Sequence, residues 1–247
     1  MTTFVLIHGA WSGAHGFNKI RRQLQSAGHE VYTPSLTGIG ERSHLASPMI
    51  NLTTHVTDLV NTVLYEDLTD FVLLGFSYGG MVITGSLQHI GERVSQLVYL
   101  DAFVPENGQS AFDLRSSNRE SSIVTGQKWY MEPVSRAMDD PQDTDWYGPR
   151  RSPQPVATFT EAVRLPVSLE TWAQQTNTKA ETSGNKRLSY IKATADDSET
   201  TDSAFWQAAR AAQQSEHWNY FEVATNHMVA INRSQELVQL LMDISDS

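Results

Sequence analysis

Short apolar runs alternate with amphipathic segments over most of the 247-residue chain. Unbroken runs such as FVLI after Thr3 are typical of strands buried on both faces, whereas apolar positions spaced by three and four residues predict helices. Gly and Pro mark most of the boundaries. We expect strands over 4–8, 29–34, 70–74, 96–100, 187–193 and 219–223, and helices over 17–26, 53–64, 81–91, 203–213 and 235–244.

This order of strands and helices predicts an α/β fold with a mostly parallel, doubly wound six-stranded sheet. The pattern changes between Phe103 and about Asn185, where strand periodicity fades and Pro, Ser, Gln and Asp become frequent. That stretch is too long for a loop and too aromatic for a disordered linker. We therefore expect an inserted helical cap over 104–185 and a core formed by 1–103 and 186–247.

The sequence GFSYGG, from Gly75 to Gly80, joins a predicted strand to a predicted helix. A serine between glycines at such a turn is typical of a nucleophile elbow, in which a strained turn exposes the hydroxyl above the sheet edge. Ser77 is therefore the candidate nucleophile. The N–H of Tyr78, at the start of the helix, is a candidate donor to an oxyanion.

Other polar residues follow the carboxyl ends of predicted strands, where ligands of doubly wound sheets bind. The N–H of Ala10, in the loop His8-Gly9-Ala10, is the second candidate oxyanion donor. His227 follows the last strand and is the best candidate for the general base that Ser77 needs. The acid that orients the histidine stays open at this point, because Asp101 and the loop with Asp196, Asp197 and Glu199 all follow strands.

Composition limits the classes of partner. The formal net charge of −10 disfavours nucleic acid and anionic membranes, which are polyanions. The absence of cysteine excludes disulfides, thiolate metal sites and a cysteine nucleophile. No signal peptide, membrane span, P-loop, dinucleotide fingerprint or metal motif is evident, so we expect a cytoplasmic protein without cofactor or metal. The sequence leaves a homodimer open.

Four segments together resemble one family: FVLIHGAW, LTGIGERSH, GFSYGGMV and LVYLDAFVPENG. The chain is similar over essentially its whole length to bacterial α/β-hydrolases close to the plant methylesterase and hydroxynitrile lyase group and to pyrethroid-hydrolysing carboxylesterases. The resemblance implies Ser77 as nucleophile, His227 as base, and Ala10 and Tyr78 as oxyanion donors. It also favours Glu199, 28 residues before the histidine, as the acid, with Asp197 and Asp196 next and Asp101 third.

Two departures from the lyases favour ester hydrolysis. The lyases resemble this chain in fold but carry lysine after the catalytic histidine and threonine after the first histidine, where this chain has Met228 and Gly9. The resemblance thus implies a serine carboxylesterase acting on a small-molecule ester, with a lyase, an amidase or a non-catalytic binding protein as alternatives. The aromatic cap predicts an apolar substrate pocket. Its candidate lining residues are Trp11, Trp129, Met131, Trp146, Phe159 and Trp172.

Overall fold

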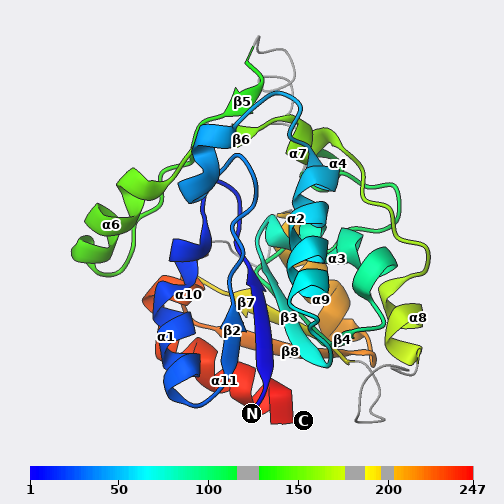
Figure 1. Cartoon of the computed structure of the whole chain (residues 1–247). Coiled ribbons are helices and arrows are strands. Elements are labelled where there is room, and N and C mark those ends of the chain that lie inside the picture. Colours follow the sequence, from blue (N-terminus) through cyan, green and yellow to red (C-terminus); the bar gives the residue numbers. More distant parts are fainter. Residues whose placement is uncertain (116–127, 176–186, 196–202, 247) are drawn as a thin grey trace.

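The computed structural model describes residues 1–115, 128–175, 187–195 and 203–246. Its centre is a six-stranded sheet of order β2-β1-β3-β4-β7-β8, and every neighbouring pair of strands is parallel (Figure 1). The strands are β1 (Thr3–Ile7), β2 (Glu30–Tyr32), β3 (Phe71–Phe76), β4 (Val94–Leu100), β7 (Arg187–Ala193) and β8 (Trp218–Val223). The expected six-stranded parallel sheet is confirmed.

Helices cover both faces of the sheet (Figure 1). One face carries α1 (Asn18–Ser26), α10 (Val229–Asn232) and α11 (Ser234–Asp246). The other carries α2 (Leu52–Tyr65), α3 (Gly79–Ile90), α8 (Leu169–Gln174) and α9 (Ala204–Gln214). The chain enters α2 through a capping box in which the Asn51 side chain accepts a hydrogen bond from the Thr54 N–H, as expected for an N-cap.

Strand side chains alternate between two hydrophobic cores. In β1, Val5 and Ile7 join the core under α2 and α3, whereas Phe4 and Leu6 join the core under α1 and α11. The strand period of two residues sends successive side chains to opposite faces. The unbroken apolar runs therefore reflect a sheet that is buried on both sides.

A set of short elements lies around the carboxyl ends of the strands, at the top and left of Figure 1. They are α4 (Ala111–Leu114), β5 (Tyr130–Met131), α6 (Pro141–Tyr147), β6 (Gln154–Pro155) and α7 (Ala157–Thr160), with 3₁₀ turns η1 (Ala14–Phe17), η2 (Gly40–Leu45) and η3 (Gly148–Arg150) nearby. The cap includes an antiparallel β5–β6 ribbon, so it is less helical than the sequence suggests. The division at 104–185 stays a prediction.

The region from 128 to 175 does not lie entirely over the sheet edge. Helix α8 packs low on the molecule, on the same face as α3 and α9 (Figure 1). None of the helices in the described ranges has the length and apolarity needed to cross a membrane.

Candidate active site

Three of the residues around the sheet edge have left-handed backbone conformations. Ser77, directly after β3, has φ 54°; Asp101, directly after β4, has φ 40°; and Trp11, in the loop after β1, has φ 61°. Residues other than glycine adopt positive φ at an energetic cost of order 1–3 kcal/mol. Such strain concentrates where backbone is bent to present a functional group, and Ser77 has the conformation expected of a nucleophile elbow.

Glycines allow three backbone segments to meet at this turn. A Cβ on Gly79 would lie 2.5 Å from the carbonyl oxygen of Ile7, and one on Gly75 would lie 2.7 Å from that of Gly79. A Cβ on Gly80 would clash with the Phe103 carbonyl. The elbow therefore fits between β1 and the segment after β4 only because no side chain is present at these positions.

The loop after β1 lies against the elbow and is ordered by His8. A Cβ on Gly9 would lie 2.9 Å from Ser77 Cβ. Nε2 of His8 accepts a hydrogen bond from the Leu36 N–H at 3.1 Å, so its Nδ1 carries the proton and donates to the Gly9 carbonyl at 2.9 Å. Burial lowers the pKa of His8 to about 4, which keeps the ring neutral in this bridging role.

The N–H groups of Ala10 and Tyr78 have no acceptor among the described residues. Tyr78 precedes the first turn of α3, where backbone donors lack partners within the helix. The two segments that carry these donors are in contact through Gly9 and Ser77. Binding of an oxyanion requires such unpaired N–H groups close to the nucleophile. Their assignment as an oxyanion hole stays a prediction.

The ring of His227 is hydrogen-bonded to Asp101. Nδ1 lies 2.6 Å from Asp101 Oδ2, and both residues are buried. Because the carboxylate accepts, the proton lies on Nδ1 and the lone pair on Nε2, as a general base requires. Phe76, the residue before Ser77, has its ring 4.7 Å from the His227 ring, so the elbow and the histidine loop are in contact.

Asp101 is buried with two positively polarised partners. Oδ1 accepts from Lys192 Nζ at 2.8 Å, while Oδ2 faces His227. Burial alone would raise the pKa of Asp101, but the hydrogen bond and charge of His227, followed by the charge of Lys192, hold this pKa below its usual range. The carboxylate is therefore ionised and able to stabilise an imidazolium.

The contact between Asp101 and His227 changes the ranking of the candidates for the acid that orients the histidine. The resemblance places Glu199 first and Asp101 third, whereas the structure puts the Asp101 carboxylate on Nδ1 of His227. Glu199, Asp196 and Asp197 lie outside the described residues. The third rank that the resemblance gives Asp101 is corrected, because Asp101 directly contacts His227.

Aromatic rings pack against Tyr78 and His227. The Phe159 ring stacks on Tyr78 at 5.1 Å and 11°, and the Phe205 ring stacks on His227 at 5.1 Å and 8°. The Tyr78 hydroxyl donates to Nδ1 of the buried His55, whose Nε2 donates to the Thr37 carbonyl. The sequence pattern did not predict a role at this site for Phe205, His55 or Lys192. For Lys192 it does contain one indication, a lone lysine in the apolar segment SYIKA.

Three of the expected pocket residues lie close to this aromatic cluster. Trp11 packs against Phe159 at 6.0 Å between ring centroids, and its Nε1 donates to the Met131 carbonyl at 3.0 Å. Phe159 and Met131 are both buried. Trp11, Met131 and Phe159 thus form one contact group at the elbow, and their role as substrate contacts stays a prediction.

The other three lie elsewhere. The Trp172 indole donates to the carbonyl of Gly91, at the end of α3 remote from Ser77. The 12 residues of α3 span about 18 Å, and Trp172 contacts the end of the helix opposite the elbow. Trp172 is therefore structural and does not line a pocket at the elbow. Trp129 and Trp146 are 40% and 39% exposed, and Trp146 packs on His15 and Arg150. The assignment of Trp172 is corrected, whereas the role of Trp129 and Trp146 as pocket residues stays a prediction.

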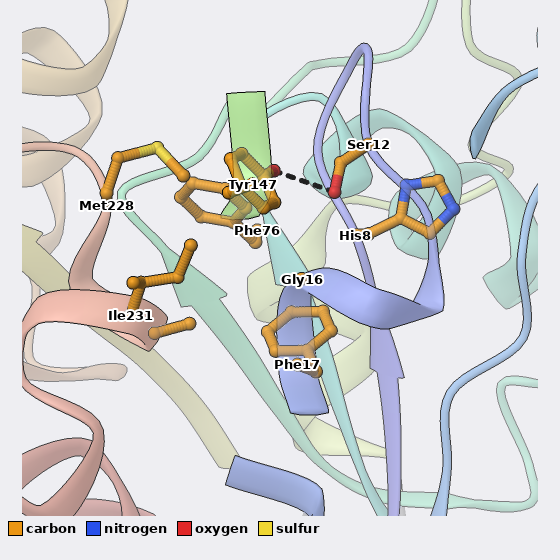
Figure 2. A pocket seen from close by; sticks show the side chains of 9 residues that line it. His8, Ser12, Gly16, Phe17, Phe76, Tyr147, Met228 and Ile231 are labelled. Carbon is orange, nitrogen blue, oxygen red and sulfur yellow. Dashed lines mark hydrogen bonds between the residues drawn. The ribbon is translucent and has the colours of Figure 1, made fainter. Parts of the chain in front are cut away.

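A small apolar cavity lies beneath the loop after β1, between that loop and the cap (Figure 2). The Tyr147 hydroxyl on α6 donates to Ser12 Oγ at 2.8 Å across its rim, while Phe76 and Met228 line its side. Its volume of about 10 Å³ is comparable to a single water molecule. The contact ties α6 of the cap to the loop that carries Ala10.

No group of three or more His, Asp or Glu side chains in the described ranges could hold a metal ion. Taken together, the described geometry gives a strained serine, a histidine with an ionised carboxylate on Nδ1, and two unpaired N–H groups at one sheet edge.

The comparison with family models accounts for nearly the whole sequence. The model described as "Alpha/beta hydrolase family" matches residues 4–240. The chain belongs to this family. A solved α/β-hydrolase from a Paenibacillus species, described as extracellular, has a TM-score of 0.79 at 22% identity and covers 98% of both chains, which supports the fold of this α/β-hydrolase.

Curated relatives match over shorter stretches. A carbendazim-hydrolysing esterase of Nocardioides sp. (strain SG-4G) is 47% identical over 114 residues, which are 46% of this chain and 47% of that protein. Methylesterase 1 of Arabidopsis thaliana is 30% identical over 118 residues, 43% and 41% of the two chains. A pyrethroid hydrolase of Sphingobium wenxiniae is 32% identical over 110 residues, 44% and 38%. This α/β-hydrolase therefore aligns with about half the length of these relatives or less.

Proposed function

We propose that this chain is a serine-dependent carboxylic ester hydrolase with Ser77 as nucleophile, His227 as general base and Asp101 as the acid. The observation that carries the proposal is the 2.6 Å contact between Asp101 Oδ2 and His227 Nδ1 at the sheet edge that also presents Ser77 at φ 54°. A buried carboxylate on Nδ1 selects the tautomer that accepts a proton at Nε2.

The reaction proceeds in two displacements. His227 Nε2 takes the proton of Ser77 as Oγ attacks the ester carbonyl, and the imidazolium then gives that proton to the leaving alcohol. Water, deprotonated by the same histidine, attacks the acyl-enzyme and releases the acid and free Ser77. Asp101 stays ionised and stabilises the imidazolium in both steps. The N–H groups of Ala10 and Tyr78 bind the oxyanion of each tetrahedral intermediate.

The surroundings of the elbow favour apolar esters. Phe159, Phe205 and Trp11 present aromatic rings near Tyr78 and His227, and Met131 lies behind Trp11. Apolar pockets with few polar anchors bind ligands mainly by burying their hydrophobic surface. Relatives are named for hydrolysing carbendazim, for methylesterase activity and for hydrolysing pyrethroids, which supports a carboxylic or related ester as the substrate class.

The test is a panel of p-nitrophenyl esters with acyl chains of increasing length, assayed with wild type and Ser77→Ala. We expect a stoichiometric burst of nitrophenol from wild type, because the acyl-enzyme accumulates, and loss of both burst and turnover in the variant. Full activity of Ser77→Ala would refute the proposal. Cyanide release from mandelonitrile would instead indicate a lyase, and tight ligand binding without turnover would indicate a binding protein. A cytoplasmic location, a homodimer and the lack of a nucleic-acid partner stay predictions.

A further inference from the structure

Lys192 is a buried cation in the interior of the sheet. It belongs to β7, whose side chains from Leu188 to Ala193 are all buried, and its own exposed fraction is 0%. Its Nζ lies 2.8 Å from Asp101 Oδ1, 2.5 Å from the Ala193 carbonyl and 4.5 Å from the centre of the Trp206 ring. Burying an ammonium is costly unless a charge and further hydrogen bonds compensate it, so this arrangement needs a reason.

We propose that Lys192 is a positioning residue of the active site: its ammonium fixes Oδ1 of Asp101, aims Oδ2 at His227, and keeps the histidine available as a base at lower pH. This inference rests on the proposed function, because it acts through the Asp101–His227 pair. Lys192 contacts no reacting atom in this mechanism; it acts only through the carboxylate.

The register between β4 and β7 brings Asp101 and Lys192 together. Leu100, the last residue of β4, pairs with Ile191 of β7. The next residues along the chain are Asp101, directly after β4, and Lys192, still within β7. The Asp101 N–H donates to the Ile191 carbonyl at 2.8 Å, which fixes its backbone against β7. Oδ1 accepts from Lys192 Nζ at 2.8 Å and, at the longer distance of 3.4 Å, from the Ala193 N–H, whereas Oδ2 faces His227. Rotation of the carboxylate would break both contacts, so Lys192 restrains the direction of the bond to His227.

The charge of Lys192 has a second effect. A lone buried carboxylate strongly favours an imidazolium beside it, and such a pair takes up a proton at comparatively high pH. The adjacent ammonium offsets part of the negative charge that attracts this proton. We therefore expect that removing the ammonium lets the Asp101–His227 pair take up its proton at higher pH. This holds whichever of the two residues carries the proton, because coupled groups titrate as a unit.

Other groups that face the pair do not replace Lys192 in this role. Tyr190, on the same strand, hydrogen-bonds to Ala102 and Phe205 backbone, and burial followed by the Asp101 charge raises its pKa well above the ordinary value, so it stays neutral. Glu222, the register partner of Lys192 on β8, is exposed and accepts from the Tyr220 hydroxyl. From α9 the facing group is the uncharged Trp206 ring. Asp196, Asp197 and Glu199 lie outside the described residues.

The experiment compares the pH dependence of kcat/KM for p-nitrophenyl butyrate in wild type, Lys192→Met and Lys192→Arg. Methionine keeps the length of the side chain without its charge, and arginine keeps the charge. Lys19→Met, which removes a half-exposed lysine paired with Asp143 and not with Asp101, is the matched control. We expect the midpoint of the acidic limb to rise by about one pH unit in Lys192→Met and to stay near wild type in the other two.

The positioning role predicts a split between kinetic constants. With the carboxylate less restrained, kcat of Lys192→Met at the plateau should fall roughly tenfold while KM changes little, because substrate contacts are retained. In an Asp101→Asn background, Lys192→Met should not lower kcat further, since Lys192 positions the histidine through that carboxylate. An unchanged limb in Lys192→Met with the same folded structure would overturn the inference and leave Lys192 a purely structural residue. Lys192→Gln serves where the methionine variant does not fold.

A readout without turnover separates this inference from the proposed function. The histidine rings are titrated by NMR in two proteins, Ser77→Ala and the double variant Ser77→Ala with Lys192→Met. The His227 signal is identified by its loss in His227→Gln. Proton uptake at higher pH in the second protein supports the role of Lys192 even if no ester is hydrolysed. Identical titrations refute it even if the esterase assay succeeds. Hydrolysis by Ser77→Ala refutes the proposed function alone.

Discussion

At the scale of single residues, the orientation of one carboxylate decides the candidate site. Asp101 and Glu199 both follow strands of the sheet, and sequence pattern does not distinguish them. The distinction comes from a backbone with φ 40° that brings Asp101 within 2.6 Å of His227. A positive φ at aspartate is tolerated because its short polar side chain can form local hydrogen bonds.

Replacing Asp101 by Asn should lower kcat by on the order of 10⁴-fold, as an amide on Nδ1 favours the wrong histidine tautomer. Glu199→Gln should stay within about threefold of wild type, because Asp101 already occupies Nδ1. Steady-state kinetics with p-nitrophenyl butyrate, on proteins with native circular dichroism, makes the comparison. A collapse of activity in Glu199→Gln together with an active Asp101→Asn would assign the acid to Glu199 instead.

At the scale of elements, close approach of β1, β3 and α3 holds the elbow in place. The contact depends on positions without a side chain, above all Gly79, where a Cβ would lie 2.5 Å from a backbone carbonyl of β1. Backbone atoms cannot rotate away as a flexible side chain can, so the strand and helix would have to separate. The glycines after Ser77 are thus packing requirements of the sheet as well as features of the turn.

The substitution Gly79→Ala should therefore lower the free energy of unfolding by about 1–3 kcal/mol. Gly148→Ala is the matched control, because a Cβ on Gly148 would have no atom within 4 Å and the residue has an ordinary backbone conformation. Its effect should stay within about 0.5 kcal/mol. Urea unfolding followed by tryptophan fluorescence measures both. Equal stability of the two variants would show that β1 and α3 adjust without cost.

At the scale of the whole molecule, two fully buried histidines couple folding to pH. Burial lowers the pKa of both His8 and His55 from 6.5 to about 4, although each keeps two hydrogen-bonded ring nitrogens. Between these values the unfolded chain binds protons that the folded chain does not. Stability is therefore full above about pH 6.5 and declines as pH falls toward about 4, by on the order of 3 kcal/mol for each ring.

Urea unfolding at several pH values between about 7 and 4 should show this decline. His55→Gln should reduce its steepness, because one of the two groups that take up a proton on unfolding is removed. His89→Gln, at an exposed position on α3, should leave the slope unchanged. A wild-type stability that is flat over this range would contradict the expectation that both rings are neutral in the folded protein.

The sequence by itself determined the sheet and the turn that carries Ser77, the proposed nucleophile. Unbroken apolar strands and the spacing of Gly75 and Gly79 depend on neighbours along the chain, so local pattern carries them. The partners of Asp101 depend on the register between β4 and β7 and on the loop after β8, which join residues 91 and 126 positions apart. Only the tertiary structure decided that Asp101 lies between Lys192 and His227 and that Trp172 lies far from Ser77, because sequence pattern does not encode which side chains meet across strands.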